Sequence, residues 1–302
     1  MSDVVRLEYR NVTMRFVERS GKSLTAVEAV SLAVGDGEVV SLIGESGSGK
    51  STIGRMVLGL SRATEGTISF EGQDVSRLER RRLHAYYADV QGVFQDPFSS
   101  YNPIFKADRV LALVKGFFPE IGRSEWDEKV ENALNAVRLE PGACLGKYPH
   151  QLSGGQLQRL MVARALLLEI ELLVADEIIS MLDASTRIDV LNLLGDLKGR
   201  GLGILFITHD LSLGNYISDR TLILRRGRVV ELGPTPKVFG DPRHSYTRAL
   251  LSCVPQLHRK WSDEAGGAVA TGNGGPPAAS ANGGGLVAVD DDHFVAPEED
   301  EA

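Results

Sequence analysis

The sequence is poor in the features that mark disulfide-bonded, zinc-binding and nucleic-acid-binding proteins. Its 302 residues include two cysteines, Cys144 and Cys253, which lie too far apart to form a CxxC-type motif. We therefore expect neither a disulfide framework nor a zinc knuckle, and a reducing compartment fits. The formal net charge of −7 argues against a nucleic-acid partner, because no overall positive field would attract phosphates.

The sequence also lacks an uninterrupted hydrophobic run long enough to cross a bilayer. The nearest candidate, residues 160–182, is interrupted by Arg164, Glu169 and Asp176, among others. Residues 1–3 lack the basic-then-apolar pattern that begins a signal peptide, so we expect no secretory signal. A role at a membrane would therefore depend on partner proteins.

Composition divides the chain into two parts. Hydrophobic residues make up 43% and charged residues 24% of the sequence, which suits a globular protein with a packed core. The C-terminal part differs, because Gly, Ala, Pro and Asn are followed there by clusters of Asp and Glu. Such a segment buries too little apolar surface to offset its ordering entropy. We expect a folded domain over residues 1–260 and a disordered tail over residues 261–302.

Short apolar runs alternate with helical patterns in the folded part. Residues 39–43, 172–175 and 204–208 are typical of buried strands. Residues 50–60 and 156–168 are typical of helices. Buried strands separated by helices predict an α/β fold with a mostly parallel sheet.

Two further patterns add to this sheet. Residues 66–70 and 222–231 contain hairpin signals, which predict an added antiparallel layer. Residues 97–152 are mainly helical in pattern, and Ser124 with Asp127 has the spacing of a capping box at a helix start. We expect this stretch to form a helical subdomain inserted between strands.

A glycine-rich loop lies between a predicted strand and a predicted helix. It matches the phosphate-binding pattern GxxxxGK[ST], in which glycines let backbone N–H groups surround phosphate oxygens at a helix N-terminus. Lys50 would reach the β- and γ-phosphates of a nucleotide, and the Ser51 hydroxyl would coordinate Mg²⁺. The alternative is a loop that only joins the strand to the helix. The candidate nucleotide-binding residues are Gly44, Glu45, Ser46, Gly47, Ser48, Gly49, Lys50, Ser51 and Thr52.

Two acidic residues follow a second predicted strand. Asp176 at the carboxyl end of this strand suits Mg²⁺ binding through water. Glu177 can then orient and deprotonate an attacking water. A buried strand followed by a solvated acidic pair is common, so the interpretation depends on the glycine-rich loop upstream.

A second candidate anion site opens the helix at residues 156–168. Ser153, Gly154, Gly155 and Gln156 place a Ser-Gly-Gly sequence at a helix N-terminus, where the helix dipole favours negative charge. The alternative is an ordinary serine N-cap followed by flexible glycines. Two phosphate sites are redundant for one nucleotide unless the second serves a nucleotide held by another subunit.

The motifs together resemble the nucleotide-binding domain of ABC transporters over roughly residues 5–255. The segment Leu152–Gln156 reads LSGGQ, which resembles that family's signature motif, and its spacing ahead of Asp176 is also typical. The resemblance implies a P-loop NTPase fold with a RecA-like parallel sheet core, an antiparallel β layer and an inserted helical subdomain. It further implies that two such domains enclose two ATP molecules, each between one phosphate loop and the opposite signature.

Other positions take their expected roles from this resemblance. Gln95 matches the Q-loop glutamine, which senses Mg²⁺ and the membrane partner. His209 matches the switch histidine that contacts the γ-phosphate, and Asp183 matches the D-loop aspartate. Phe16 stands where the family places an aromatic ring that stacks on adenine, although a core or surface role is as plausible from the sequence. Ile178 stands where the family usually has proline after the catalytic glutamate, a change that removes no reacting group.

Two stretches resemble one branch of the superfamily. Residues 95–103 and 244–251 are similar to the dipeptide, oligopeptide and nickel importers, some of whose relatives import oligosaccharides. The resemblance implies ATP and Mg²⁺ as ligands and transmembrane permease subunits as partners. It also implies a second ATPase subunit, with a heterodimer favoured over a homodimer, and an indirect link to a solute-binding protein. The chain would act at the cytoplasmic face of the cell membrane.

Two other classes of function remain open at this point. A non-transport ABC ATPase would act in translation or DNA repair. Repair types insert long coiled coils before the signature, and translation types usually carry two cassettes. A P-loop kinase of small molecules would need an acceptor site and would not use the LSGGQ segment. We therefore expect an ATPase (ATP hydrolysis coupled to transmembrane solute transport).

Overall fold

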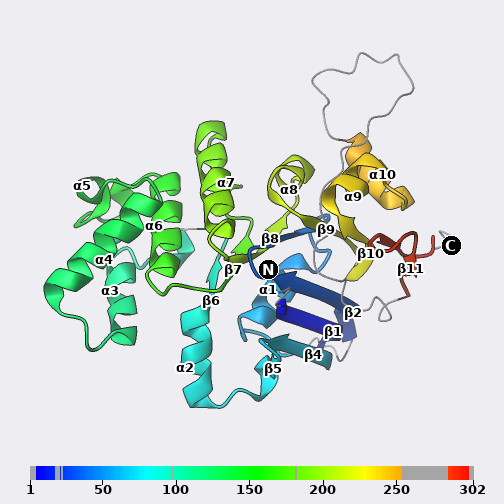
Figure 1. The fold of residues 1–302 in the computed structure, drawn as a ribbon, viewed down its shortest axis with the longest axis horizontal. Coiled ribbons are helices and arrows are strands. Elements are labelled where there is room, and N and C mark those ends of the chain that lie inside the picture. Colours follow the sequence, from blue (N-terminus) through cyan, green and yellow to red (C-terminus); the bar gives the residue numbers. More distant parts are fainter. Residues whose placement is uncertain are drawn as a thin grey trace.

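The chain folds around two β-sheets, with a group of helices on one side and the C-terminal elements on the other (Figure 1). A computed structural model describes residues 5–17, 21, 23–96, 98–180, 182–253 and 285–298, without the side chains of Arg80 and Arg81. Within these ranges, no helix combines the length and the apolar character that crossing a membrane requires.

The chain begins with three strands, and four helices, α3 to α6, follow one another between β6 and β7. The strands are β1 (Val5–Val17), β2 (Ser23–Gly35), β3 (Val39–Ile43), β4 (Glu65–Phe70), β5 (Gln73–Asp74), β6 (Val90–Val93), β7 (Leu172–Asp176), β8 (Gly203–Thr208), β9 (Arg220–Arg225), β10 (Arg228–Pro234), β11 (Val287–Ala288) and β12 (Phe294–Val295). The helices are α1 (Lys50–Val57), α2 (Arg80–Asp89), α3 (Arg109–Val114), α4 (Arg123–Ala136), α5 (Pro141–Cys144), α6 (Gly154–Leu166), α7 (Ala184–Lys198), α8 (Leu211–Ile217), α9 (Thr235–Gly240) and α10 (Ser245–Ser252).

The larger sheet has the strand order β11-β12-β10-β9-β3-β8-β7-β6. Its centre is parallel, because β3 pairs with β8 and β9, and β7 pairs with β6 and β8. Every residue of β3, β7 and β8 is buried, which explains why these strands are continuous apolar runs in the sequence. The carboxyl ends of the three strands meet at one edge, where Gly44, Glu177 and His209 follow them.

The smaller sheet is antiparallel, with the order β2-β1-β4-β5, and it forms the expected antiparallel layer. The hairpin of β4 and β5 belongs to this layer. The other expected hairpin, β9–β10, does not. It extends the larger sheet instead, because β9 pairs in parallel with β3 through its other edge.

Helices α3 to α5 lie within the helical subdomain expected over residues 97–152, and α6 packs against α3 and α4 just beyond it, so the subdomain is taken as α3 to α6, on the left in Figure 1. Trp126, Val130 and Leu134 lie buried on one face of α4. The expected capping box at Ser124 is wrong, because α4 begins one residue earlier and has no side-chain cap. Gly122 takes the cap position with an extended backbone, so Ser124 lies inside the first turn.

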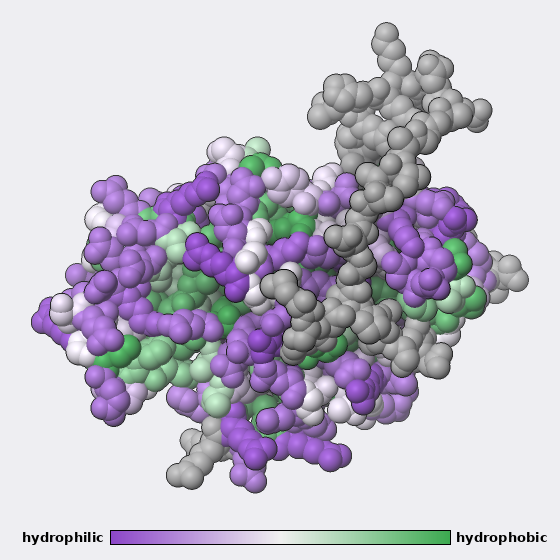
Figure 2. Space-filling view, in the orientation of Figure 1, coloured by the Kyte–Doolittle hydropathy of each residue, from purple (hydrophilic) through white to green (hydrophobic). Residues whose placement is uncertain are grey.

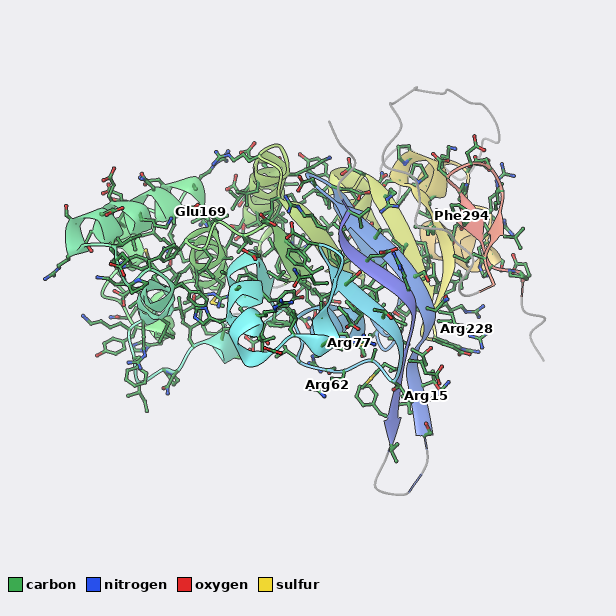
Figure 3. All side chains as sticks on the ribbon, turned by 60° about the horizontal axis from the view of Figure 1, so that its bottom comes forward. Arg15, Arg62, Arg77, Glu169, Arg228 and Phe294 are labelled. Carbon is green, nitrogen blue, oxygen red and sulfur yellow. The ribbon has the colours of Figure 1, made fainter. Side chains whose placement is uncertain are left out.

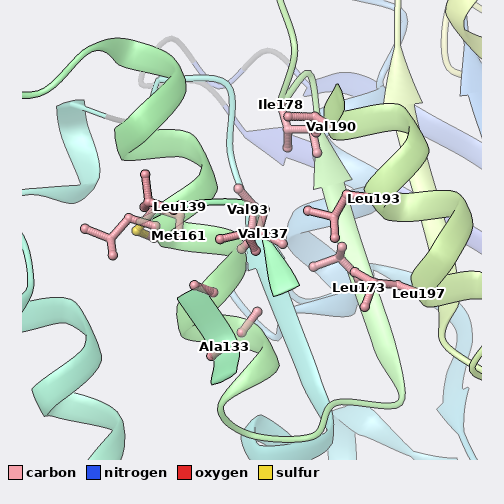
Figure 4. Packing of buried hydrophobic residues seen from close by; sticks show 14 of the residues in the cluster. Val93, Ala133, Val137, Leu139, Met161, Leu173, Ile178, Val190, Leu193 and Leu197 are labelled. Atoms are coloured by element: carbon pink, nitrogen blue, oxygen red, sulfur yellow. The ribbon is translucent and has the colours of Figure 1, made fainter. Parts of the chain in front are cut away.

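One buried cluster joins the helical subdomain to the larger sheet. It includes Val93 of β6, Leu173 of β7 and Leu193 of α7 (Figure 4). Ile178, the first residue after the acidic pair, lies beside Val190 in the same cluster and is 1% exposed (Figure 4). Burying such a side chain contributes about 1.5–3 kcal/mol. The isoleucine that departs from the family pattern is therefore a core residue.

The surface of the helical subdomain carries exposed hydrophobic side chains. Figure 2 shows a mostly hydrophilic face on which hydrophobic residues gather over this subdomain. The large exposed hydrophobic residues of the subdomain include Ile104, Phe105 and Leu113. Apolar side chains that gather on an exposed surface often mark a contact with another protein.

The C-terminal tail is partly folded, so the expected disorder over residues 261–302 is wrong for residues 285–298. Strand β12, which carries Phe294 (Figure 3), pairs with β10, and β11 forms the edge of the larger sheet beside it. Nε2 of His293 lies 2.8 Å from Oε1 of Glu231, and both side chains are buried. Composition reveals a low apolar content, but it does not reveal a specific polar pair of this kind. Residues 261–284 and 299–302 lie outside the described part of the chain.

Candidate functional site

The glycine-rich loop joins β3 to α1 in a conformation that requires glycine at two positions. Gly49 has a φ of 103°, and a Cβ atom there would lie 2.4 Å from the carbonyl oxygen of Ala26. A Cβ atom at Gly44 would lie 2.2 Å from the carbonyl oxygen of Leu224. The absence of side chains thus lets the loop approach β2 and β9 closely and places it at the N-terminus of α1, where the helix dipole favours anions.

The ammonium group of Lys50 turns back into this loop. Its Nζ atom donates to the carbonyl oxygens of Gly44 and Glu45, both at 2.7 Å. Lys50 is 5% exposed, and burial lowers the pKa of its ammonium group. A buried cation held by neutral carbonyl groups is suited to an anionic ligand such as phosphate.

A hydroxyl and a carboxyl group meet behind the loop. Oγ of Ser51 donates to Oδ1 of Asp176 at 3.3 Å, and burial raises the pKa of this carboxyl. Oxygen donors are the ligands that Mg²⁺ prefers, and a divalent cation would favour the ionised carboxylate. Among the described residues no three His, Cys, Asp or Glu side chains form a metal-binding group. The donors therefore fit a cation that phosphate and water also coordinate, as is usual for Mg²⁺.

Glu177 and His209 face each other across adjacent strand ends. Nδ1 of His209 lies 2.9 Å from Oε1 of Glu177. Glu177 has a φ of 50°, and its backbone N–H donates to the carbonyl oxygen of Ile207 at 2.9 Å. The left-handed conformation is uncommon for a residue with a side chain, and in folded proteins such positions cluster at functional sites.

A cavity of about 690 Å³ lies over the loop, which is within the range that small-molecule ligands occupy. It brings together most of the loop residues with three other residues singled out in the sequence, Gln95, Glu177 and His209. Ser48 and Asp176 are buried and do not line it. The lining residues are Ile43, Gly44, Glu45, Ser46, Gly47, Gly49, Lys50, Ser51, Thr52, Gln95, Glu177, His209, Leu211 and Leu250.

The LSGGQ residues lie outside this cavity. Ser153 caps α6, because its Oγ atom accepts from the backbone N–H of Gln156 at 3.2 Å. The side chain of Gln156 in turn accepts from the backbone N–H of Ser153 at 2.9 Å. The serine is therefore an N-cap in a full capping box, and neither it nor Gly154 and Gly155 contributes to the cavity of its own chain.

Asp183 and Phe16 also lie outside the cavity. Asp183 caps α7, and hydrogen bonds from Ser185 and Thr186 hold the pKa of its carboxyl well below the ordinary value. A Cβ atom at Gly155 would lie 2.9 Å from Cγ2 of Thr186, so the LSGGQ helix and the start of α7 are in close contact. Phe16 is 42% exposed on β1.

Sequence reasoning missed three apolar residues of the cavity, Ile43, Leu211 and Leu250. Leu211 opens α8 directly after the strand end that carries His209, so the strand-end argument could have included it. Leu250 belongs to α10, far along the chain from the loop. Residues 244–251, which include Leu250, resemble one branch of importers in sequence, but this resemblance gave no reason to place Leu250 in the cavity.

Comparison with known proteins identifies the family. Residues 27–180 match the model of the ABC transporter family. The chain belongs to the ABC transporter family. Residues 230–280 also match the C-terminal region of oligopeptide/dipeptide transporters. The glycine-rich loop and the LSGGQ segment, which match the family's phosphate-loop and signature motifs, are called the phosphate loop and the signature below.

Two curated relatives illustrate the similarity. The oligopeptide transport ATP-binding protein OppF of Escherichia coli is 39% identical over 83% of this chain and 78% of its own length. The protein of the same name from Streptococcus mutans is 41% identical over 83% of this chain and 82% of its own length.

A solved structure confirms the predicted fold. The ATP-binding cassette MJ0796, in a dimeric post-hydrolysis state bound to ADP and Pi, aligns with a TM-score of 0.68. It is 28% identical in sequence, and the alignment covers 76% of this chain and 98% of that one. The chain is thus an ATP-binding, ATP-hydrolysing subunit with the P-loop NTPase fold.

Proposed function

We propose that the chain hydrolyses ATP to drive the import of di- and oligopeptides through permease subunits in the membrane. One observation carries the hydrolytic role: Glu177 and His209 lie 2.9 Å apart in the cavity that the phosphate loop lines. The two OppF relatives and the match of residues 230–280 to the oligopeptide/dipeptide transporter C-terminal region support peptides as the cargo.

The phosphate loop would hold the β- and γ-phosphates of ATP. Lys50 would exchange its bonds to backbone carbonyl groups for bonds to phosphate oxygens, which are stronger because both partners are charged. Phe16 is exposed enough on β1 to stack against the adenine ring.

Ser51, Asp176 and Gln95 would hold Mg²⁺. The first two already share a hydrogen bond, and Gln95 lines the same cavity. When bound, Mg²⁺ would offset negative charge on the transferred phosphoryl group.

Glu177 would act as the general base. Its carboxylate would accept a proton from the attacking water, and His209 would hold the γ-phosphate while keeping the carboxylate oriented. The uncommon backbone conformation of Glu177 directs its side chain toward His209 in the cavity.

Each nucleotide would be completed by a second ATPase subunit. The signature residues Ser153 to Gln156 and Asp183 lie outside the cavity of their own chain, so they are available to contact a nucleotide that a partner holds. The dimeric state of MJ0796 supports a paired arrangement. We favour a heterodimer of two different ATPases.

The helical subdomain would contact the permease. Its exposed side chains Ile104, Phe105 and Leu113 suit an apolar contact with a membrane-embedded subunit. This contact would hold the chain at the cytoplasmic face of the membrane. A solute-binding protein would affect the chain only indirectly, through the permease subunits.

Reconstitution tests this proposal. The chain is reconstituted in proteoliposomes with the permease and ATPase subunits that co-purify with it, with ATP inside and a solute-binding protein outside, and ATPase activity is measured. We expect oligopeptides to stimulate hydrolysis and to accumulate inside, whereas nickel and oligosaccharides do neither. Stimulation by nickel or an oligosaccharide alone would contradict the cargo, and the absence of any permease partner would contradict transport.

A further inference from the structure

Helix α10 contacts the phosphate loop, although it is not part of the loop. The hydroxyl oxygen of Tyr246 accepts a hydrogen bond from the backbone N–H of Glu45 at 3.4 Å. One turn further along the helix, Leu250 lines the nucleotide cavity. Tyr246 also packs in a buried cluster with Ile43, the last residue before the loop. The helix therefore contacts both the loop and the strand that carries it.

This contact fixes a peptide group that Lys50 holds from the other side. Nζ of Lys50 donates to the carbonyl oxygen of Gly44 at 2.7 Å, and the N–H of Glu45, which belongs to the same peptide group, donates to Tyr246. An ammonium group has three donors, and two of them are used on loop carbonyl groups here. When the ammonium turns to phosphate, the bond to Tyr246 can persist, because it does not involve Lys50.

The tyrosine is itself well held. Its ring lies under the guanidinium group of Arg225, with the carbon of that group 5.0 Å from the ring centre. Its backbone N–H donates to Nδ1 of His244 at 3.1 Å, which caps the helix. Burial raises the pKa of the Tyr246 hydroxyl, so the hydroxyl stays protonated at neutral pH.

The C-terminal segment, residues 285–298, holds the first turn of α10. Oε1 of Glu298 accepts from the backbone N–H of Ser245 at 2.8 Å, and its other oxygen accepts from the Ser245 hydroxyl. The backbone N–H of Ala296 donates to the carbonyl oxygen of Val230 at 2.9 Å, and its side chain packs against the cluster that contains Tyr246. The segment thus contacts α10, and α10 in turn contacts the phosphate loop.

We propose that Tyr246 is a positioning residue of the nucleotide site, and that residues 285–298 keep its helix in place. The inference rests on nucleotide binding at the phosphate loop, as in the proposed function. Tyr246 meets the loop at Glu45, through both the backbone N–H and the carboxyl side chain of that residue. It acts by holding the peptide group between Gly44 and Glu45 in the conformation that receives the phosphates.

Removal of one hydroxyl group tests the role of Tyr246. Tyr246→Phe keeps the ring against Arg225 and deletes the hydroxyl that contacts Glu45. Tyr216→Phe is the matched control, because its hydroxyl bonds Asn192 and it does not line the cavity. Loss of one neutral hydrogen bond predicts an affinity for MgATP that is about threefold to tenfold weaker in Tyr246→Phe. We expect the melting temperature without nucleotide to be unchanged and its rise on adding MgATP to be smaller.

Turnover in the assembled complex separates positioning from general damage. We expect Tyr246→Phe to raise the KM for ATP and leave kcat unchanged, since Glu177 and His209 are untouched. Glu298→Gln weakens the acceptor that holds Ser245 and should change affinity in the same direction by a smaller factor. Wild-type affinity and KM in Tyr246→Phe would overturn the inference. If the wild-type chain itself fails to bind MgATP, the proposed function fails instead.

Discussion

Nδ1 of His209 and Oε1 of Glu177 lie 2.9 Å apart at the ends of two adjacent parallel strands. Strand β7 ends one residue before Glu177, and strand β8 ends one residue before His209. The pairing of β7 with β8 therefore places the two side chains next to each other without any long loop. This arrangement makes the carboxylate of Glu177 the natural candidate for the base that activates water.

The first prediction concerns this carboxylate. Glu177→Gln keeps the shape and the hydrogen bond to His209 but removes the basic oxygen. We expect ATPase activity in the assembled complex to fall at least about 100-fold, while the affinity for ATP stays within about twofold of wild type. The two quantities are measured by phosphate release and by equilibrium nucleotide binding.

Glu169→Gln is the matched control. Glu169 also has a positive φ, 56°, and lies in the surface loop between α6 and β7 (Figure 3). Its carboxylate pairs with Lys129 and does not line the nucleotide cavity. Near-normal turnover in Glu177→Gln, or an equal loss in Glu169→Gln, would remove the case for a base at Glu177.

A second prediction concerns the buried pair of His293 and Glu231. His293→Leu keeps a side chain of similar size but leaves Oε1 of Glu231 with one fewer donor. Glu231 retains hydrogen bonds from two backbone N–H groups, those of Arg243 and His244. We expect a loss of about 2–3 kcal/mol in the free energy of unfolding, or about 4–10 °C in Tm. The same substitution at the exposed His84 should change the free energy by less than about 0.5 kcal/mol.

The effect of His293→Leu should depend on pH. Burial alone would raise the pKa of Glu231, but hydrogen bonds from His293 and backbone N–H groups lower it below the ordinary value. A carboxyl whose pKa is lower in the folded state stabilises the fold above its unfolded pKa, and this contribution disappears as the pH falls through the folded value. Urea unfolding should show the full difference between wild type and variant above about pH 5 and a shrinking one below about pH 4. A difference that grows at low pH would contradict this account.

The strand-end residues of the site could be predicted from the sequence because parallel strands bring their carboxyl ends to one edge. Glu177 and His209 gather around the phosphate loop for this reason, whereas Gln95 was singled out only by its resemblance to the Q-loop glutamine. Leu250 could not be predicted, because its place depends on how α10 packs on β9 and β10. Nothing in the local pattern of residues 245–252 encodes that contact.

The C-terminal tail shows a different limit of sequence reasoning. Its low apolar content led to an expectation of disorder, yet residues 285–298 dock through hydrogen bonds and ion pairs. His293 is buried against Glu231, and Asp290 pairs with Lys237 at 2.9 Å. Each partner lies more than 50 positions away in the sequence, so no local pattern points to it.

A third prediction compares the two glycines of the signature. A Cβ atom at Gly155 would lie 2.9 Å from Cγ2 of Thr186, whereas at Gly154 the nearest atom would be 4.0 Å away. Thr186 cannot move freely, because its hydroxyl donates to Asp183 at 2.8 Å. We expect Gly155→Ala to be less stable than Gly154→Ala by about 1–2 kcal/mol, measured by urea unfolding of the isolated chain. Equal stability would show that the LSGGQ helix and α7 are not closely packed.

The last prediction concerns the composite site. The phosphate loop and the signature of this chain do not share a cavity, so each is expected to complete a nucleotide site with a second subunit. The isolated chain should bind ATP but hydrolyse it slowly, and Ser153→Arg should impair hydrolysis of the nucleotide that the partner holds. A mixture of Lys50→Ala chains and Ser153→Arg chains distinguishes the possible dimers, because one site of the mixed dimer carries both defects and the other carries none. We expect no recovery of ATPase activity in this mixture, and activity only when a second ATPase subunit is added. Recovery would indicate a homodimer, and full activity in a wild-type preparation shown by light scattering to be monomeric would refute a composite site altogether.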